Sequence, residues 1–487
     1  MGRGLRNELG KWVTHILPAE DVVPEVYAAW RPLVRDAMLF MITRLSPARL
    51  APKIVEQLQL PPETTPEARL LRLIAKVPGL QKIGQVLARN RYLHPSLRTA
   101  LSQLENGISD VEPPEILSMI RAELGSRLDR YKVEIEPEMF SEASVSAVMR
   151  FTWLNPESGE RERGVFKVLK PYVPSCFKED MRLLQQLAVF LAAKHPEYGR
   201  ALPETINNVR ELLEREVDYA REQATLAEAA RIYGHLPGVR VPHLFRPLST
   251  ARITALSEEH GVKVTAAFAR EPVARRRRVA EQLIETLVAV PLLARDDKAI
   301  LHADPHAGNL LYDERTGDLV VLDWALTERL TREQRRHVAL LAVMIGLRDP
   351  LGVCGEITAL SIGGGHARMI RERVTRFIEQ LPFTRLPGSL EAMRLLDQLA
   401  LEGVRFPTPL MMFRKVLFTL DGILHDIGAP VNMDRIIARE LAKRWLSKWT
   451  AIGSPLSLMD WVAVQSSALL YSGRLWVQWA QAALATE

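Results

Sequence analysis

"ILHADPHAGNLLYDERTGDLVVLDW" (residues 300–324) contains two short apolar runs, NLLY and LVVLD, joined by the polar segment DERTGD. Apolar runs on either side of a polar segment that includes a glycine are typical of a β-hairpin. If Tyr312 pairs with Leu319, the side chains of Asn309 and Asp323 come to the same end of that hairpin. The stretch therefore predicts a ribbon that presents an amide and a carboxylate side by side.

The polar side chains of this stretch have the spacing of a metal-dependent phosphotransfer site. Asn309 and Asp323 offer two oxygen donors, and Asp304 adds a carboxylate in the loop before the first strand. Magnesium binds a few protein oxygens and completes its shell with water and phosphate oxygens. Asp304 is then placed to orient or deprotonate an acceptor hydroxyl. Carboxylates that only cap a turn are the alternative, and the nearby His302 favours the functional interpretation.

A cation for the phosphates is expected upstream, because phosphoryl transfer uses a lysine that is held by a helix carboxylate. Lys167 lies in the middle of the apolar run GVFKVLKP. Glu216, Asp218 and Glu222 follow in a helical pattern, and the last two are spaced to share one helix face. A half-exposed strand lysine and a solvated acidic face are the alternatives. The pattern predicts that one of these carboxylates pairs with Lys167.

The rest of the chain alternates between helical and sheet-forming parts. Residues 1–130 have apolar residues at helical spacing and no strand alternation. The runs YKVEIEP, VSAVMRFTWL and GVFKVLKP follow, and three successive strands of this kind predict an antiparallel sheet. The remainder is mostly helical apart from the hairpin. This order predicts an α+β fold.

Composition and charge exclude several classes of protein. The 487 residues are 47% hydrophobic and 25% charged, which is ordinary for a globular protein, and the net charge of +6 is mild. The run Arg275–Arg278 has the pattern of a solvated helix face, so nucleic-acid binding is not expected. Cys176 and Cys354 show no metal-ligand spacing, and the N-terminus shows no signal-peptide core, which predicts a cytoplasmic protein. Residues 456–485 have the pattern of an amphipathic helix that packs on the protein's own core or makes a peripheral membrane contact.

The ordered set of motifs resembles a known family. HADPHAGN is similar to the HADPHPGN signature of the UbiB-type (AarF-domain) atypical kinases. Further motifs of that family occur in the expected order over roughly residues 75–330, and the set is far more specific than any one motif. They are the K-x-G-Q motif at Lys82 to Gln85, the E-x-D motif at Glu216 and Asp218 with Glu222 following, and Ala143-Ser144 at the end of the Ala-rich loop that replaces a kinase Gly-rich loop.

The resemblance implies a protein-kinase-like bilobal fold that binds ATP and Mg²⁺. It assigns residues 1–130 to a helical extension, 131–260 to the N-lobe, and 261–487 to a helical C-lobe with a helical tail. The resemblance implies that Lys167 contacts the phosphates with Glu222 as its partner, that Asn309 and Asp323 bind Mg²⁺, and that Asp304 holds the catalytic-loop position. It implies that Ala143 and Ser144 contact the nucleotide. It also implies that Lys82 and Gln85 close over the site, with Lys82 meeting Glu216 and Asp218.

Family members are implicated in isoprenoid-quinone or other lipid metabolism. The expected function is therefore an ATP- and Mg²⁺-dependent kinase or ATPase that acts on, or supports the metabolism of, a small lipophilic substrate, with biosynthetic protein partners as a further option. Two alternatives stay open. One is a nucleotide-binding scaffold of a biosynthetic complex with little turnover. The other is an aminoglycoside- or choline-type phosphotransferase, against which KIGQ and the helical extension argue.

Three residues in two of the motifs depart from the family pattern. Ser141 and Glu142 stand where alanines are usual, and the triplet that begins at Asp323 ends in Ala325 instead of glycine. A carboxylate near the phosphates is expected to weaken nucleotide binding unless it faces solvent or a metal. The lysine and metal positions are all present, which favours catalysis.

Overall fold

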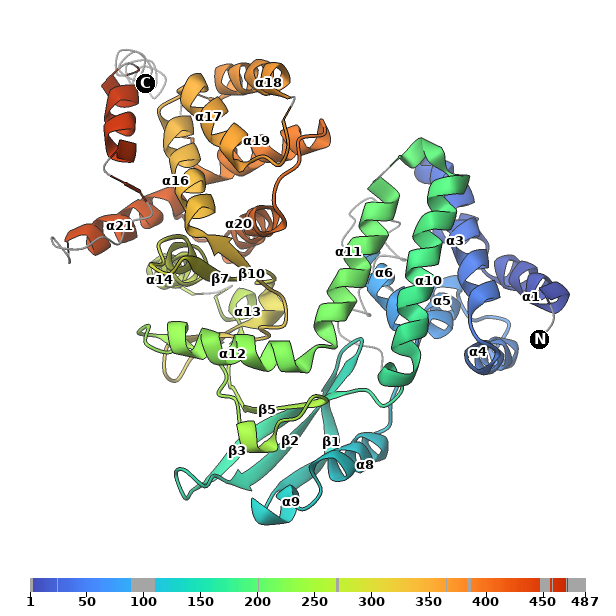
Figure 1. Ribbon diagram of the computed structural model, residues 1–487. Coiled ribbons are helices and arrows are strands. Elements are labelled where there is room, and N and C mark those ends of the chain that lie inside the picture. The colour runs from blue at the N-terminus through green and yellow to red at the C-terminus, as the bar shows by residue number, and fades with distance from the viewer. Residues whose placement is uncertain are drawn as a thin grey trace. The chain divides into compact units, whose positions relative to one another are not determined.

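The computed structural model divides into two compact units, each described here by itself (Figure 1). Unit 1 comprises Met1–Ala224 and His243–Glu258, and unit 2 comprises Thr225–Pro242 and Glu259–Glu487. The structure describes residues 3–23, 25–88, 110–199, 201–268, 271–364, 366–382, 387–446, 456–457, 459–469 and 471.

Unit 1 contains a four-stranded antiparallel sheet in the order β1-β2-β3-β5. Its strands are β1 (Glu134–Glu142), β2 (Ser146–Leu154), β3 (Arg161–Leu169) and β5 (Ile253–Ser257). Side chains of β2 alternate between buried and partly exposed, as expected for a sheet with one face on a core. The predicted three-stranded antiparallel sheet is confirmed, and β5 extends it beside β3.

Aromatic side chains fill the core beneath this sheet, where α8 (Pro113–Leu124) packs. The rings of Phe151 and Phe166 are stacked with centroids 3.8 Å apart. Gly164 is required beside them, because a Cβ atom there would lie 2.6 Å from the Leu256 carbonyl oxygen. The close contact between β3 and β5 at this point fixes the strand that carries Lys167.

Helices account for the rest of unit 1, and the apolar faces of several of them share one core. Their bounds are α1 (Arg3–Ile16), α2 (Ala19–Val22), η1 (Glu25–Trp30), α3 (Arg31–Arg44), α4 (Pro47–Gln59), α5 (Pro66–Ile74), α6 (Pro78–Ala88), α9 (Arg127–Arg130), α10 (Val173–Lys194), η2 (Pro196–Tyr198), α11 (Ala201–Glu216) and η3 (Arg246–Leu248), and α12 (Tyr219–Tyr233) continues from unit 1 into unit 2. The helical run predicted over residues 95–108 lies outside the described residues.

Unit 2 is built around the hairpin of β8 (Leu310–Asp313) and β9 (Asp318–Val321). Tyr312 pairs with Leu319, so the predicted register is confirmed. This hairpin lies in a sheet of order β4-β9-β8-β6. The strands that come before and after the hairpin in the chain form a separate two-stranded sheet. The other strands are β4 (Val239–Arg240), β6 (Val262–Lys263), β7 (Lys298–His302) and β10 (Thr327–Thr331), of which β7 and β10 pair with each other.

The remaining elements of unit 2 are helical. They are α13 (Val264–Ala267), α14 (Val273–Ile284), the π-helix η4 (Glu285–Ala289), α15 (Val290–Leu292), η5 (Ala307–Asn309), α16 (Arg332–Gly346), α17 (Pro350–Leu360), α18 (Ala367–Gln380), α19 (Ser389–Leu401), α20 (Thr408–Asp426) and α21 (Met433–Leu446). In the predicted C-terminal tail, residues 459–469 are helical, and residues 472–485 lie outside the described residues. None of the helices that the structure describes has the length and apolar character needed to span a membrane.

One helix prediction is wrong. Glu216, Asp218 and Glu222 were predicted to lie in one helical pattern, but α11 ends at Glu216 and α12 begins at Tyr219. Asp218 lies between them, and its Oδ1 accepts a hydrogen bond from the Arg221 backbone N–H (3.0 Å). A short carboxylate side chain that caps a helix N-terminus in this way favours a break in the run over continuation. Asp218 therefore does not share a helix face with Glu222.

Candidate active site

Lys167 projects from β3 toward α12 and meets Glu222. The Lys167 ammonium lies 2.5 Å from Glu222 Oε1, and the side chains are 19% and 5% exposed. The ammonium also lies 5.7 Å from the centre of the Tyr219 ring. A carboxylate this deeply buried needs a cation beside it. The structure thus brings together the predicted lysine and the third of its three candidate carboxylates.

Glu216, at the end of α11, joins two of the predicted nucleotide-contacting segments. Its Oε1 accepts from the Lys82 ammonium of α6, and its Oε2 accepts from the Ser144 hydroxyl (3.4 Å). Ala143, beside Ser144, donates its backbone N–H to the Ser146 carbonyl (2.8 Å). One carboxylate therefore ties the K-x-G-Q helix to the loop between β1 and β2. Gln85, on the same helix as Lys82, is buried.

Lys82 was also predicted to meet Asp218, and the structure places Asp218 differently. Its side chain is exposed and caps α12 as described above. Of the E-x-D pair, Glu216 makes the contact with Lys82. The Ser144 link to Glu216 was not expected from the sequence, because a small loop residue gives no signal of its hydrogen-bond partner.

Substitution of Lys82 tests the role of this link. In Lys82→Ala, Glu216 loses its cation and the loop at Ser144 loses part of its support, so we expect turnover or nucleotide preference to change about fivefold or more. Lys178→Ala, an exposed lysine on α10, is the matched control and is expected to behave as wild type. Steady-state kinetics with ATP and GTP measure both. Unchanged kinetics in Lys82→Ala would mean that α6 has a purely structural role.

In unit 2, Asp304 lies in the loop after β7 and is half-buried. Its Oδ1 is 2.7 Å from the Lys415 ammonium of α20. The Asp304 backbone N–H donates to His302 Nδ1 (3.4 Å), and His302 Nε2 lies 2.9 Å from the Leu322 carbonyl oxygen. Full burial lowers the pKa of His302, which keeps this ring neutral near pH 7. His302 therefore links the loop of Asp304 to the hairpin through hydrogen bonds.

Asn309 and Asp323 come to one end of the hairpin, as predicted. The Leu322 backbone N–H donates to the Asn309 carbonyl (2.8 Å), which extends the ladder by one pair. Asn309 Nδ2 donates to the Asp304 carbonyl (3.1 Å), so the amide oxygen of Asn309 is the atom left for a cation. Asp323 is exposed and has a φ of 51°, a left-handed conformation that aspartate tolerates better than most residues.

The segment after Asp323 is fixed by burial. The Trp324 indole N–H donates to the Val321 carbonyl (3.1 Å), and its ring packs against His302 and Tyr233 with centroids 4.9 Å and 5.1 Å away. The Ala325 backbone N–H donates to Asp323 Oδ1 (3.2 Å). The alanine in place of the family's glycine thus keeps a backbone contact that orients the carboxylate.

The donor set of Asn309 and Asp323 fits a hard divalent cation. It offers an amide oxygen and a carboxylate at the same end of the β8–β9 hairpin. Among the described residues there is no cluster of three or more His, Cys, Asp or Glu arranged for a metal. Magnesium suits such a sparse set, because it completes its shell with water and phosphate oxygens.

Two features of the site were missed from the sequence. The first is Lys415, which follows Arg414 in the otherwise apolar run MMFRKVLFTL and pairs with Asp304. The second is the partner of Glu142. The Lys170 ammonium is fully buried, 2.8 Å from Asp110 and 3.7 Å from Glu142. The expectation that Glu142 faces solvent or a metal, or else weakens nucleotide binding, is therefore corrected: Glu142 faces a buried lysine that offsets its charge.

Comparison with known proteins identifies the family. Residues 103–354, more than half of the chain, match the model of the ABC1 atypical kinase-like domain. The chain belongs to this family. The kinase-like α+β fold and the UbiB-type resemblance expected from the sequence are confirmed.

Several relatives of this ABC1-family chain are known by name. It is 22% identical over 401 residues to the uncharacterized protein sll1770 of Synechocystis sp., covering 80% of this chain and 66% of that one. It is 23% identical over 417 residues to the probable protein kinase UbiB of Xylella fastidiosa (82% and 72%). It is 24% identical over 370 residues to the chloroplastic protein ACTIVITY OF BC1 COMPLEX KINASE 7 of Arabidopsis thaliana (74% and 52%). The chain thus spans 52–72% of the length of these relatives.

Among solved structures, the Rv3197–erythromycin complex from Mycobacterium tuberculosis aligns with a TM-score of 0.49 and 17% identity. The alignment covers 80% of this chain and 96% of that chain.

Proposed function

We propose that this ABC1-family protein is an ATP- and Mg²⁺-dependent atypical kinase or ATPase that acts on, or supports the metabolism of, a small lipophilic substrate. The observation that carries the proposal is the buried ion pair of Lys167 with Glu222, because a strand lysine held by a helix carboxylate is the phosphate-binding device of kinase-like folds. The hairpin with Asn309 and Asp323 supplies the second requirement, a site for the metal that accompanies the nucleotide.

Each residue has a distinct task in this proposal. Lys167 binds the nucleotide phosphates, and Glu222 keeps its ammonium in place. Asp304 orients the acceptor hydroxyl or water and accepts its proton, and Lys415 holds the Asp304 side chain. Asn309 and Asp323 would hold Mg²⁺, which would supply charge neutralisation at the phosphates. Ser144 and Ala143 form part of the wall around the phosphates, with Glu216 and Lys82 supporting that loop.

The proposal extends to where the protein acts. A lipophilic substrate is reached most readily at a membrane surface, and the helix over residues 459–469 exposes Met459, Trp461, Val462 and Leu469. The buried Asp460 on the same helix accepts a hydrogen bond from Arg336 Nε (2.7 Å), and this bond holds the helix against α16. We propose a cytoplasmic protein with a peripheral membrane contact through this helix.

ATP turnover by wild type and Lys167→Met tests the function. We expect Mg²⁺-dependent phosphate release by wild type and a rise of about tenfold or more in the KM for ATP in Lys167→Met, since a charge-assisted phosphate contact is lost. Arg161→Met, an exposed cation on the same strand, is the control and is expected to match wild type.

Other outcomes separate the alternatives. Tight ATP binding without turnover, with lipid and small phenols present, would identify a nucleotide-binding scaffold. Transfer of phosphate to a soluble amino-alcohol would identify a small-molecule phosphotransferase. Either result contradicts the proposed function.

A further inference from the structure

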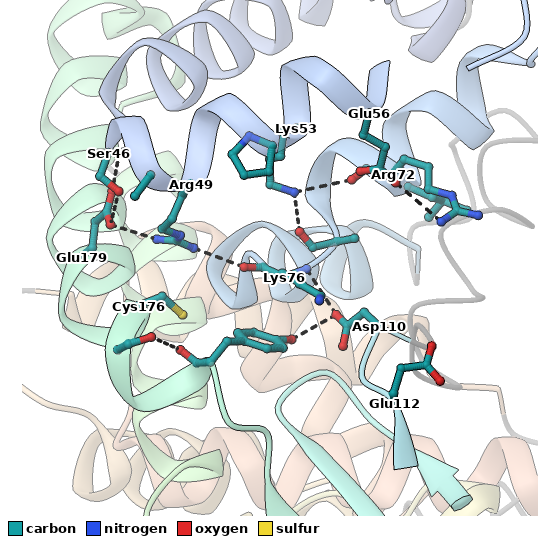
Figure 2. A pocket seen from close by; sticks show the side chains of 16 residues that line it. Ser46, Arg49, Lys53, Glu56, Arg72, Lys76, Asp110, Glu112, Cys176 and Glu179 are labelled. Carbon is teal, nitrogen blue, oxygen red and sulfur yellow. Dashed lines mark hydrogen bonds and ion pairs between the residues drawn. The ribbon is translucent and has the colours of Figure 1, made fainter. Parts of the chain in front are cut away.

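A large pocket lies in the helical part of unit 1. It has a volume of about 1050 Å³ and is lined by α4, α5, the segment 110–112 and the start of α10 (Figure 2). A volume of this size accommodates a small organic ligand. The expected site residues do not line it.

The pocket contains one buried cation, Lys53 on α4. Lys53 is 8% exposed, and its ammonium donates to the carbonyl oxygens of Ala75 (2.5 Å) and Arg72 (3.5 Å) at the end of α5. An ammonium has three donors, so one remains beyond these two carbonyls. Within the described part of the chain, no carboxylate oxygen comes within ion-pair distance of this ammonium. Glu56, Asp110, Glu112 and Glu179 also line the pocket, and these two hydrogen bonds of the Lys53 ammonium go to backbone carbonyls. A buried ammonium with a donor left over is stabilised by an anion beside it.

Two arginines also line the pocket, and both already have carboxylate partners. Arg49 lies 2.5 Å from Asp180. It also lies 3.3 Å from Glu179, and Arg72 lies 3.5 Å from Glu56 (Figure 2). These pairs leave Lys53 as the buried charge that a ligand can neutralise. Apolar surface lies beside it, contributed by Ala48, Pro52, Leu71 and Ala75.

We infer that this pocket binds a small amphipathic organic anion, with its carboxylate or phosphate group on Lys53 and its apolar body against Pro52 and Leu71. The charged group satisfies the remaining donor of the buried ammonium. The apolar body covers surface that water otherwise occupies. Neither inorganic phosphate nor a neutral alcohol of the same length offers both contacts.

The pocket is also connected to the loop at Ser144. Lys76, on the pocket wall, donates its backbone N–H to Asp110 Oδ2 (3.2 Å), and the Gln81 amide nitrogen donates to the same oxygen (3.3 Å). The Tyr172 hydroxyl, also on the wall, lies 3.0 Å from Asp110 and 3.4 Å from the Ser144 carbonyl. A ligand that shifts Tyr172 therefore changes the support of this loop. This second part of the inference rests on the proposed function, in which the Ser144 loop contacts the nucleotide.

The ionisation of Lys53 gives the pocket a distinctive pH dependence. Burial lowers the pKa of Lys53 to about 8. The ammonium is therefore charged at pH 7 and is mostly neutral at pH 9, and a bound anion favours the charged form. Anion affinity is expected to fall by roughly tenfold per pH unit above pH 8, because proton uptake then accompanies binding.

Calorimetric titration with decanoate as the probe tests the binding site. We expect wild type at pH 7 to bind decanoate at least about tenfold more tightly than decanol or inorganic phosphate, and Lys53→Met to lose this preference. Lys178→Met, an exposed lysine of α10 that does not line the pocket, is expected to match wild type. The comparison of pH 7 with pH 9 uses wild type alone, so it tests the site even where Lys53→Met fails to fold.

Three results would overturn the binding inference: equal affinity for decanoate and decanol, Lys53-dependent binding of phosphate as tight as that of decanoate, or decanoate affinity that is the same at pH 7 and pH 9. The connection to the loop is tested by the ATP dissociation constant with and without saturating decanoate, where we expect a change of at least about threefold. Decanoate binding without such a change overturns the connection alone. Decanoate binding to a protein that binds no ATP contradicts the proposed function and leaves the pocket site intact.

Discussion

Asp323→Asn is expected to lower Mg²⁺-dependent ATP turnover by about 100- to 1000-fold, because the charge at the metal is lost at the point where phosphate charge must be neutralised. The fold should persist. Asparagine has the same size, adopts the left-handed conformation that Asp323 holds at φ 51°, and can still accept the Ala325 N–H through Oδ1.

The matched control for Asp323→Asn is Glu314→Gln, which neutralises an exposed carboxylate at the turn of the same hairpin. Its turnover should equal that of wild type. The measurement is kcat/KM for ATP at several Mg²⁺ concentrations. A loss of less than tenfold in Asp323→Asn would show that the carboxylate does not hold the metal.

Lys170→Met is expected to destabilise unit 1 by about 3–5 kcal/mol, since it leaves buried carboxylates without their cation. The Lys170 ammonium is 0% exposed, and the carboxylates of Asp110 and Glu142 are 4% and 7% exposed. Methionine fills a similar volume, so the cost comes from charge and not from a cavity. Hydrogen exchange resolved by peptide, in β1 and β2, reports the lower free energy of opening.

The triple variant Lys170→Met, Asp110→Asn, Glu142→Gln separates charge from packing. Removing all three charges is expected to recover at least half of the loss, because neutral buried groups cost far less than unpaired carboxylates. A single variant with near wild-type exchange, or a triple variant no more stable than the single one, would show that this buried cluster does not hold the β1–β2 loop in place.

Local patterns in the sequence predicted the hairpin and its register. The two apolar runs and the turn segment allowed one pairing, Tyr312 with Leu319, and the structure has it. Alternation also predicted three strands of the unit 1 sheet, and the lone lysine in an apolar strand pointed to Lys167. Such features depend on residues close together in the chain, so a single sequence carries them.

The sequence pattern did not predict contacts between residues that are far apart in the chain. Asp218 was predicted to share a helix face with Glu222, but it caps the next helix, because capping competes with helix continuation at acidic residues. Lys415 lies 111 residues after Asp304, and Lys170 lies 60 after Asp110. A separation of that length along the chain does not determine how two side chains lie in space. The charge balance around Glu142 could therefore be established only from the structure.

The proposed function requires both Lys167 and Asp323 for ATP turnover. A double-mutant cycle on kcat/KM for ATP, with wild type, Lys167→Met, Asp323→Asn and the double variant, tests it directly. Residues that act as a unit on one substrate are strongly non-additive, so the double variant should be scarcely slower than Asp323→Asn alone. Losses that multiply in the double variant would contradict the claim.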